Sequence, residues 1–136
     1  MELTGAAHRA GVKILAGTDY IVAGAYLHRE LEQLVAAGLT PSEALHAATL
    51  APAEYFGLEG HYGSVAAGKT ADLILLEANP LEDIRNTQRL SAVLFNGNLY
   101  DRAALDRISD HVQRQARSWS VACKILWGFI KSPASY

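Results

Sequence analysis

The chain has 136 residues, enough for one domain, whereas a complete eight-stranded barrel needs about 250. Its single cysteine excludes an internal disulfide and a cysteine-rich metal centre, and its net charge of -2 argues against general nucleic-acid binding. There is no apolar run of membrane-spanning length and no signal-peptide pattern at the start. We therefore expect a cytoplasmic protein without a nucleic-acid partner, and we do not favour a membrane as its partner.

The first part of the chain predicts a helix, a strand and a second helix. Residues 2–10 suit the end of a helix closed by Gly11, and the short apolar run over 12–16 is typical of a buried strand. Apolar residues at helical spacing predict a helix over 27–37, and Gly38 suits its C-terminal cap.

A further helix is predicted from its start signal. Thr40 can cap it, Pro41 fits its first turn and Glu43 completes a capping box. We expect this helix to run to about Thr49 and to stop before Pro52, because proline interrupts helical hydrogen bonding.

The pattern after Gly57 changes to loops and short strands. The apolar run over 73–76 predicts a strand, and Asn96-Gly97 predicts a hairpin turn because both residues tolerate positive φ. Residues 101–117 are typical of a helix. Helical spacing continues in the last segment, 111–136, which holds four basic residues and no acidic one.

The composition predicts three parts: residues 1–56, 57–110 and a basic amphipathic tail helix over 111–136. The apolar stripe of that tail comprises Trp119, Ala122, Cys123, Leu126, Trp127 and Ile130. Three interpretations remain open: a helix that covers a bare sheet surface, a helix that contacts a membrane or partner, or a non-native ending.

Asp19 is the main candidate for a functional residue. It ends Ala16-Gly-Thr-Asp19, directly after the predicted strand, where barrel enzymes carry catalytic groups. A strand-end aspartate that only caps a turn is the ordinary alternative.

The histidines form no local metal chelate, because no pair has His-x-His or His-x3-His spacing. They are His8, His28, His46, His61 and His111. We interpret His28 as a polar residue at a helix start and His46 as half-buried in its helix. The stretch Gly63–Thr70 matches the P-loop pattern, but a strand rather than a helix is predicted after it, so we do not expect nucleotide binding.

Several motifs in order resemble the C-terminal part of amidohydrolase-superfamily enzymes of the imidazolonepropionase- and prolidase-like group. They are Ala10–Asp19, Leu27–Leu31, Ala37–Pro41, Glu43–Leu45, Ala48–Pro52, Gly57-Leu58, Gly63–Leu73, Asn79–Leu81 and Asn96-Gly97. The resemblance implies an α/β fold: the last strand–helix unit of a TIM-type metal-bearing barrel, plus the C-terminal strands of a small β-sandwich over 63–76 and 92–100, with an extra C-terminal helix.

The resemblance also implies a function. Family members hydrolyse C–N and related bonds with one or two divalent metal ions, zinc being our first expectation, and Asp19 matches the aspartate that ligates metal and shuttles a proton. The other ligands of the family come from earlier strands, so we expect a truncated piece that is inactive and metal-free alone. We further expect a homo-oligomer or a complementary chain as partner. The alternative is a non-catalytic module that binds itself or another protein.

Overall fold

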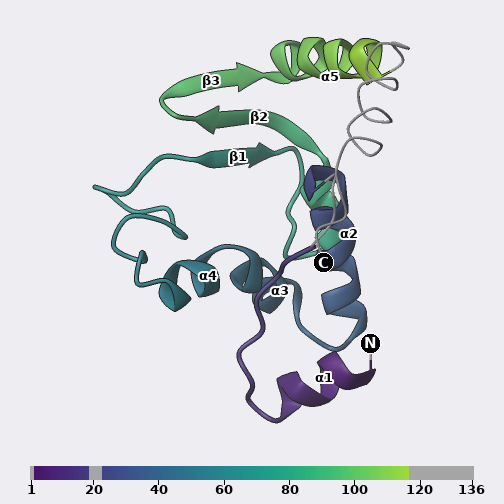
Figure 1. The fold of residues 1–136 in the computed structure, drawn as a ribbon, viewed down its shortest axis with the longest axis vertical. Coiled ribbons are helices and arrows are strands. Elements are labelled where there is room, and N and C mark those ends of the chain that lie inside the picture. Colours follow the sequence, from purple (N-terminus) through teal and green to yellow (C-terminus); the bar gives the residue numbers. More distant parts are fainter. Residues whose placement is uncertain (1, 19–22, 117–136) are drawn as a thin grey trace, which may run out of the picture. The chain divides into compact units, whose positions relative to one another are not determined.

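The computed structural model describes residues 2–18 and 23–116, which form a mixed α/β fold of helices and one small sheet (Figure 1). Two compact units meet between residues 99 and 100, and each is described by itself. The described elements are α1 (Glu2–Arg9), α2 (Ala23–Ala36), α3 (Pro41–Ala48), α4 (Leu50–Tyr55), β1 (Leu73–Leu76), the 3-10 helix η1 (Ile84–Gln88), β2 (Leu90–Phe95), β3 (Asn98–Asp101) and α5 (Arg102–Ala116). Across these residues, no helix combines the length and the apolar character that a membrane crossing requires.

Local sequence signals fix the ends of the first three helices. Gly11 follows α1 with φ of 77°, and Gly38 follows α2 with φ of 115°, a region that favours glycine. At the start of α3, the Glu43 N–H donates to Thr40 Oγ1 at 3.2 Å, and the Thr40 N–H donates to Glu43 Oε2 at 2.7 Å. These three predicted boundaries are confirmed, although α2 begins earlier than expected, at Ala23.

The predicted end of the third helix is confirmed: α3 ends at Ala48, before Pro52, and the helical path breaks at Thr49, where φ is −128° and ψ is −79°. A separate helix, α4, begins directly after this break, and Pro52 is its third residue. Residues in the first turn of a helix have no intrahelical partner for their N–H, so a proline there loses no hydrogen bond.

Residues 12–16 form no strand, contrary to the prediction, and the segment 12–18 is irregular. A strand needs a neighbour that pairs with its backbone groups. Among the described residues this segment has only isolated backbone bonds, such as the Ala16 N–H that donates to Ala47 O at 2.9 Å. The run is only partly buried: Val12 is 56% exposed, whereas Ile14 and Ala16 pack against the hydrophobic core.

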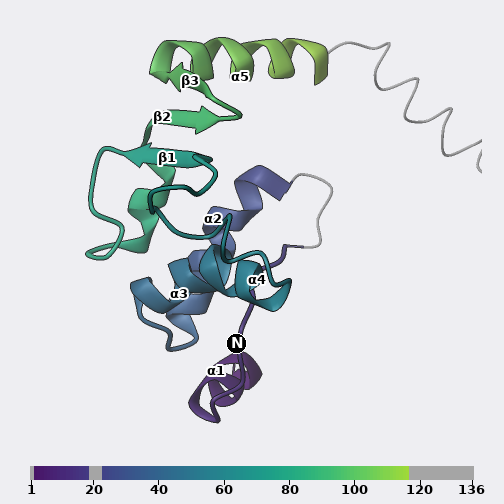
Figure 2. The ribbon, with the colours of Figure 1, turned by 90° about the vertical axis from the view of Figure 1, so that its left-hand side faces the viewer.

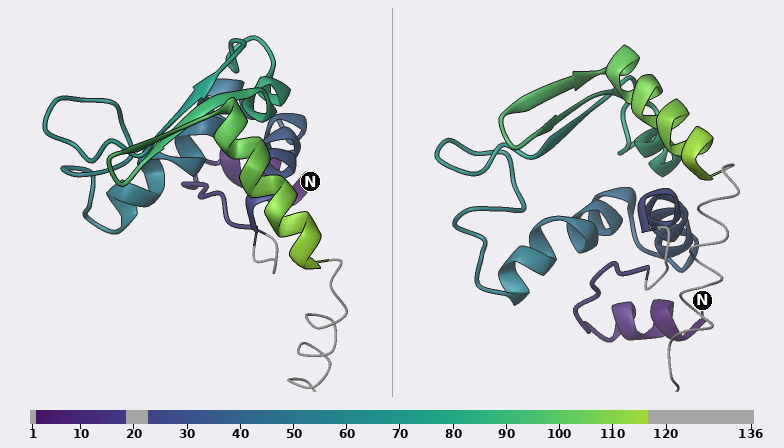
Figure 3. Two further views of the ribbon diagram at one scale, coloured as in Figure 1. Left: turned by 90° about the horizontal axis from the view of Figure 1, so that it is seen from above. Right: turned by 45° about the horizontal axis from the view of Figure 1, so that its top comes forward.

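The three strands form one sheet in the order β1-β2-β3, visible from above in Figure 3. β1 and β2 are antiparallel, with Leu73 opposite Leu94. Asn96 (φ 48°) and Gly97 (φ 75°) join β2 to β3, and positive φ at both positions is the geometry of a tight hairpin turn. The strand over 73–76 and the hairpin are thus confirmed, whereas no strand forms over residues 63–72.

The core of the first unit lies where α2 packs against α3 and η1, and Figure 2 shows α2 beside α3. Its buried side chains are Leu31, Leu34, Leu39, Ala44, Ala47 and Ile84. Thr87 of η1 is also buried, and its hydroxyl donates to Ile84 O at 2.8 Å, which satisfies a polar group that burial would otherwise destabilise.

Strand β1 lies at an edge of the sheet, and within the described part of the chain side chains on both of its faces are exposed. Ile74 is 54% exposed and Leu75 is 62% exposed. Because consecutive residues of a strand point to opposite faces, both faces of β1 present apolar side chains.

Helix α5 confirms the helix predicted over 101–117. The Ala104 N–H donates to Asp101 Oδ1 at 2.8 Å, so Asp101 satisfies one of the free donors at the start of this helix. The predicted tail stripe lies outside the described residues, and the proposed boundaries after residues 56 and 110 stay predictions.

Candidate functional site

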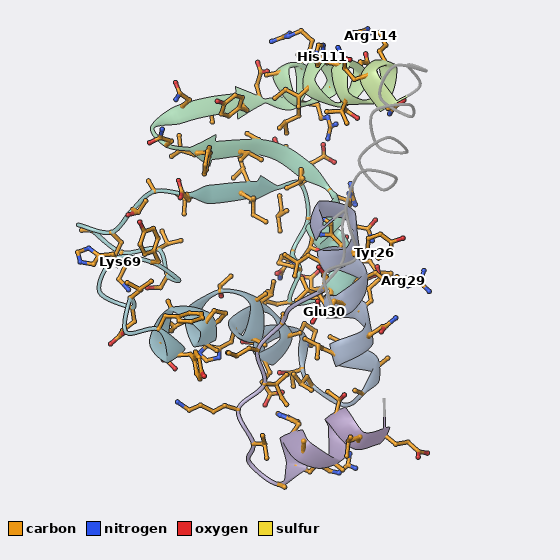
Figure 4. The ribbon with its side chains drawn as sticks, in the orientation of Figure 1. Tyr26, Arg29, Glu30, Lys69, His111 and Arg114 are labelled. Atoms are coloured by element: carbon orange, nitrogen blue, oxygen red, sulfur yellow. The ribbon has the colours of Figure 1, made fainter. Side chains whose placement is uncertain are left out.

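Asp19 lies outside the described residues, but the residues on both sides of it border one cavity. The cavity has a volume of about 390 Å³ and lies between the end of segment 12–18 and the middle of α2. Its lining is Gly17, Thr18, Tyr26, Arg29, Glu30 and Gln33. Figure 4 shows Tyr26, Arg29 and Glu30 along α2.

Glu30 links the helix to the irregular segment. Its Oε1 accepts the Gly17 N–H at 2.7 Å, a bond between positions 13 apart in sequence. Its other oxygen, Oε2, is buried and has no hydrogen-bond partner in the described parts of the chain. A short N–H bond to a carboxylate is charge-assisted and stronger than a neutral one. Glu30 therefore holds the backbone two residues before Asp19.

The sequence analysis missed Glu30, although a signal existed. Glu30 lies three residues after Leu27 and four before Leu34, so helical spacing places its carboxylate on the same side as the apolar stripe. A charged side chain on the apolar side of a helix is seldom buried without a partner, so this position predicts a specific contact for Glu30.

His28 connects α2 to η1. Its Nδ1 lies 3.1 Å from Thr87 Oγ1, and the hydroxyl hydrogen of Thr87 is already donated to Ile84 O. With its hydrogen directed at Ile84 O, the hydroxyl can accept a hydrogen bond from an N–H at His28 Nδ1. This bond explains why a histidine lies near the apolar face of α2.

His46 is exposed, not half-buried as predicted, because it points away from the face of α3 that carries Ala44 and Ala47. It lines a second cavity of about 270 Å³ together with His8 and Glu43. His8 Nε2 lies 3.5 Å from Glu43 Oε1. Hydrogen bonds from the Thr40 backbone and hydroxyl, and to a lesser extent the nearby His8, hold the pKa of Glu43 below its ordinary value of 4.5.

No group of three or more His, Cys, Asp or Glu side chains within residues 2–18 and 23–116 could hold a metal ion. The residues described therefore do not make a metal site by themselves. Glu30 is the acidic side chain that lines the cavity beside Thr18, the residue before Asp19, and one of its carboxylate oxygens has no partner among the described residues.

The stretch that matches the P-loop pattern has the wrong structure for phosphate binding. Lys69 turns back on its own loop, and its Nζ donates to Glu59 O at 2.5 Å and to Ser64 Oγ at 2.6 Å (Figure 4). The element that follows is strand β1, not a helix whose N-terminus could face a phosphate. The prediction that a strand rather than a helix follows this stretch is confirmed.

Comparison with known proteins finds several enzymes that are similar to part of this chain. Adenine deaminase 3 of Rhizobium meliloti (strain 1021) is 39% identical over 75 residues, which are 53% of this chain and 13% of that protein. Imidazolonepropionase of Rubrobacter xylanophilus is 43% identical over 65 residues, which are 46% of this chain and 16% of that protein. The crystal structure of a Xaa-Pro dipeptidase with bound methionine in the active site matches with a TM-score of 0.67 and 34% identity, covering 73% of this chain and 25% of that one.

The chain thus spans a quarter or less of the length of these relatives. The model of the amidohydrolase family matches residues 1–100, which is most of the sequence. The resemblance found in the motifs is confirmed, and the chain belongs to the amidohydrolase family.

Proposed function

We propose that this chain supplies the C-terminal share of a metal-dependent hydrolase of C–N or related bonds and is inactive alone. The observation that carries this proposal is the family match over residues 1–100 in a chain that spans 13–25% of the relatives named above. In this proposal, segment 12–19 is the last strand of a TIM-type barrel, α2 is its last helix, and the sheet of β1, β2 and β3 is part of a small sandwich.

Asp19 is the residue that this chain contributes to the proposed metal site. Members of the family generally bind divalent metal ions, and zinc is our first expectation for this site. A zinc site takes three or four protein ligands. Because the described residues offer no such set, the proposal requires further ligands from polypeptide beyond this sequence or from another copy.

The proposed assembly is supported by the open strand β1. Ile74 and Leu75 expose apolar surface on opposite faces of an edge strand, and such edges pair readily with other chains. We propose a homo-oligomer or a complex with a complementary chain that completes the barrel. A cytoplasmic setting stays a prediction.

The metal content of the purified chain, measured by elemental mass spectrometry beside its light-scattering mass, tests the proposal. A monomer should carry far less than one zinc per chain and hydrolyse no amide substrate. An assembly that retains about one zinc per chain should lose it in Asp19→Ala. The assembly should keep its zinc in the control Asp110→Ala, which removes an exposed carboxylate of α5. Stoichiometric zinc in Asp19→Ala would refute the role of Asp19.

The alternative function, a non-catalytic binding module, is not favoured by the relatives, which are named as an adenine deaminase, an imidazolonepropionase and a dipeptidase. It gains support only if the chain forms a defined, metal-free oligomer whose mass is the same for the wild type and for Asp19→Ala.

A further inference from the structure

We infer that Glu30 is a positioning residue: its carboxylate, carried on α2, holds the end of the irregular segment 12–18 by the Gly17 backbone, two residues before Asp19 in the sequence. Any part that this hold plays in the role of Asp19 rests on the proposed function, whereas the hold on Gly17 does not. Gly17 N–H donates to Glu30 Oε1 at 2.7 Å.

The bond is the main restraint on the end of this segment. Two backbone bonds hold its earlier part, from Val12 N–H to Ala7 O at 3.0 Å and from Ala16 N–H to Ala47 O at 2.9 Å. Beyond Ala16, the bond from Gly17 N–H to Glu30 Oε1 joins the segment to the rest of the described chain. A segment without a neighbouring strand has no ladder of hydrogen bonds, so a single strong bond has a large effect on its path.

The second oxygen of Glu30 argues against a purely stabilising role. Oε2 is buried and has no partner among the described residues. A buried, unpaired carboxylate oxygen opposes folding. Among the described residues, Gly17 N–H is therefore the donor to this carboxylate, and a hydrogen bond to a charged acceptor is stronger than one to a neutral acceptor. The side chain therefore contributes more to the local position of the backbone than to the stability of the fold.

Glu32 offers a matched control on the same helix. Its Oε1 accepts a hydrogen bond from Gln88 Nε2 at 2.8 Å. Glu32 therefore also binds another element through its carboxylate, but that element is η1 and not segment 12–18. Glu30→Ala and Glu32→Ala remove the same charge and the same number of atoms. Only the first removes the hold on Gly17.

Amide hydrogen exchange measured by NMR on the full chain tests the inference, with urea unfolding measured on the same samples. In Glu30→Ala, the Gly17 amide should exchange about tenfold to a hundredfold faster, the effect of losing a hydrogen bond to a charged acceptor. Glu30→Gln keeps one neutral acceptor and should fall between the wild type and Glu30→Ala. The amides of Ala44 and Ala47 in the core should be unchanged, and the urea midpoint should be no lower than that of Glu32→Ala.

Each other outcome overturns the inference. Unchanged exchange at Gly17 in Glu30→Ala means that the bond does not hold the segment. Faster exchange in the core together with a lowered midpoint means that Glu30 is a stabilising residue only. If Glu30→Ala fails to fold, Glu30→Gln decides: wild-type exchange at Gly17 then shows that the charge plays no part.

The result is separable from the proposed function. A confirmed hold on Gly17 together with zinc retention in Asp19→Ala would refute the role of Asp19 and leave the inference on Glu30 intact. A loss of zinc in Asp19→Ala with unchanged Gly17 exchange in Glu30→Ala would do the reverse.

Discussion

Three glycines of one loop allow steric overlap and backbone strain to be measured separately. A Cβ built on Gly63 would lie 2.8 Å from Leu50 Cα and 2.9 Å from Ala53 Cβ, and φ of Gly63 is 88°. Gly68 has a similar φ of 86° but no atom within 4 Å of its added Cβ. Gly60 has neither a positive φ nor a close neighbour. The three alanine variants therefore carry both penalties, the strain alone, and neither.

The magnitudes follow from these geometries. A left-handed φ destabilises a residue with a Cβ by about 1–2 kcal/mol, and overlap with fixed backbone and core atoms adds about 1–3 kcal/mol. The free energy of unfolding should thus fall by about 2–5 kcal/mol in Gly63→Ala and by about 1–2 kcal/mol in Gly68→Ala. In Gly60→Ala it should change by less than about 0.5 kcal/mol.

Urea unfolding followed by circular dichroism measures the series. With a slope of about 2 kcal/mol per molar urea, in the middle of the usual range, the midpoint of Gly63→Ala should lie roughly 1–2.5 M below that of the wild type. A midpoint for Gly63→Ala at or above that of Gly68→Ala would refute the reasoning, because it would mean that the loop does not pack on the start of α4.

Three further predictions concern the helical core. Thr40→Ala removes the cap of α3 and should lower the free energy of unfolding by about 1 kcal/mol in urea titrations; an unchanged value would contradict the role of the capping box. The lowered pKa of Glu43 means that its stabilisation is present above pH 4.5 and is lost as the pH falls through the lower folded-state value. Glu43→Gln should therefore flatten the stability–pH curve below about 4.5, and an unaltered acid slope would count against this. Leu34→Ala should lower the free energy of unfolding by about 2–5 kcal/mol, while Leu3→Ala, at an 83% exposed site, should leave it nearly unchanged.

The features predicted correctly are those whose physical cause is local in the sequence. The capping box from Thr40 to Glu43 and the hairpin turn at Asn96-Gly97 depend on residues at most three apart. The helix over α2 follows from the period of its apolar residues, which the core of the first unit buries. Family membership also followed from short motifs in a fixed order.

The features that were missed depend on residues distant in sequence or absent from it. The bond from Gly17 to Glu30 joins two elements whose approach the sequence does not encode locally. Residues 12–16 have the composition of a buried strand, but strand formation requires a neighbouring strand, and the described residues supply none.

The edge strand β1 also has a charged residue next to each of its ends. Asp72 precedes it and accepts the Asn96 N–H at 3.1 Å, and Glu77 follows it, with one carboxylate oxygen 3.6 Å from a guanidinium nitrogen of Arg89. Charges that flank an apolar strand act as gatekeepers, since stacking such strands in register brings like charges together. The four consecutive apolar residues of β1 can therefore stay exposed while open-ended fibre growth is disfavoured.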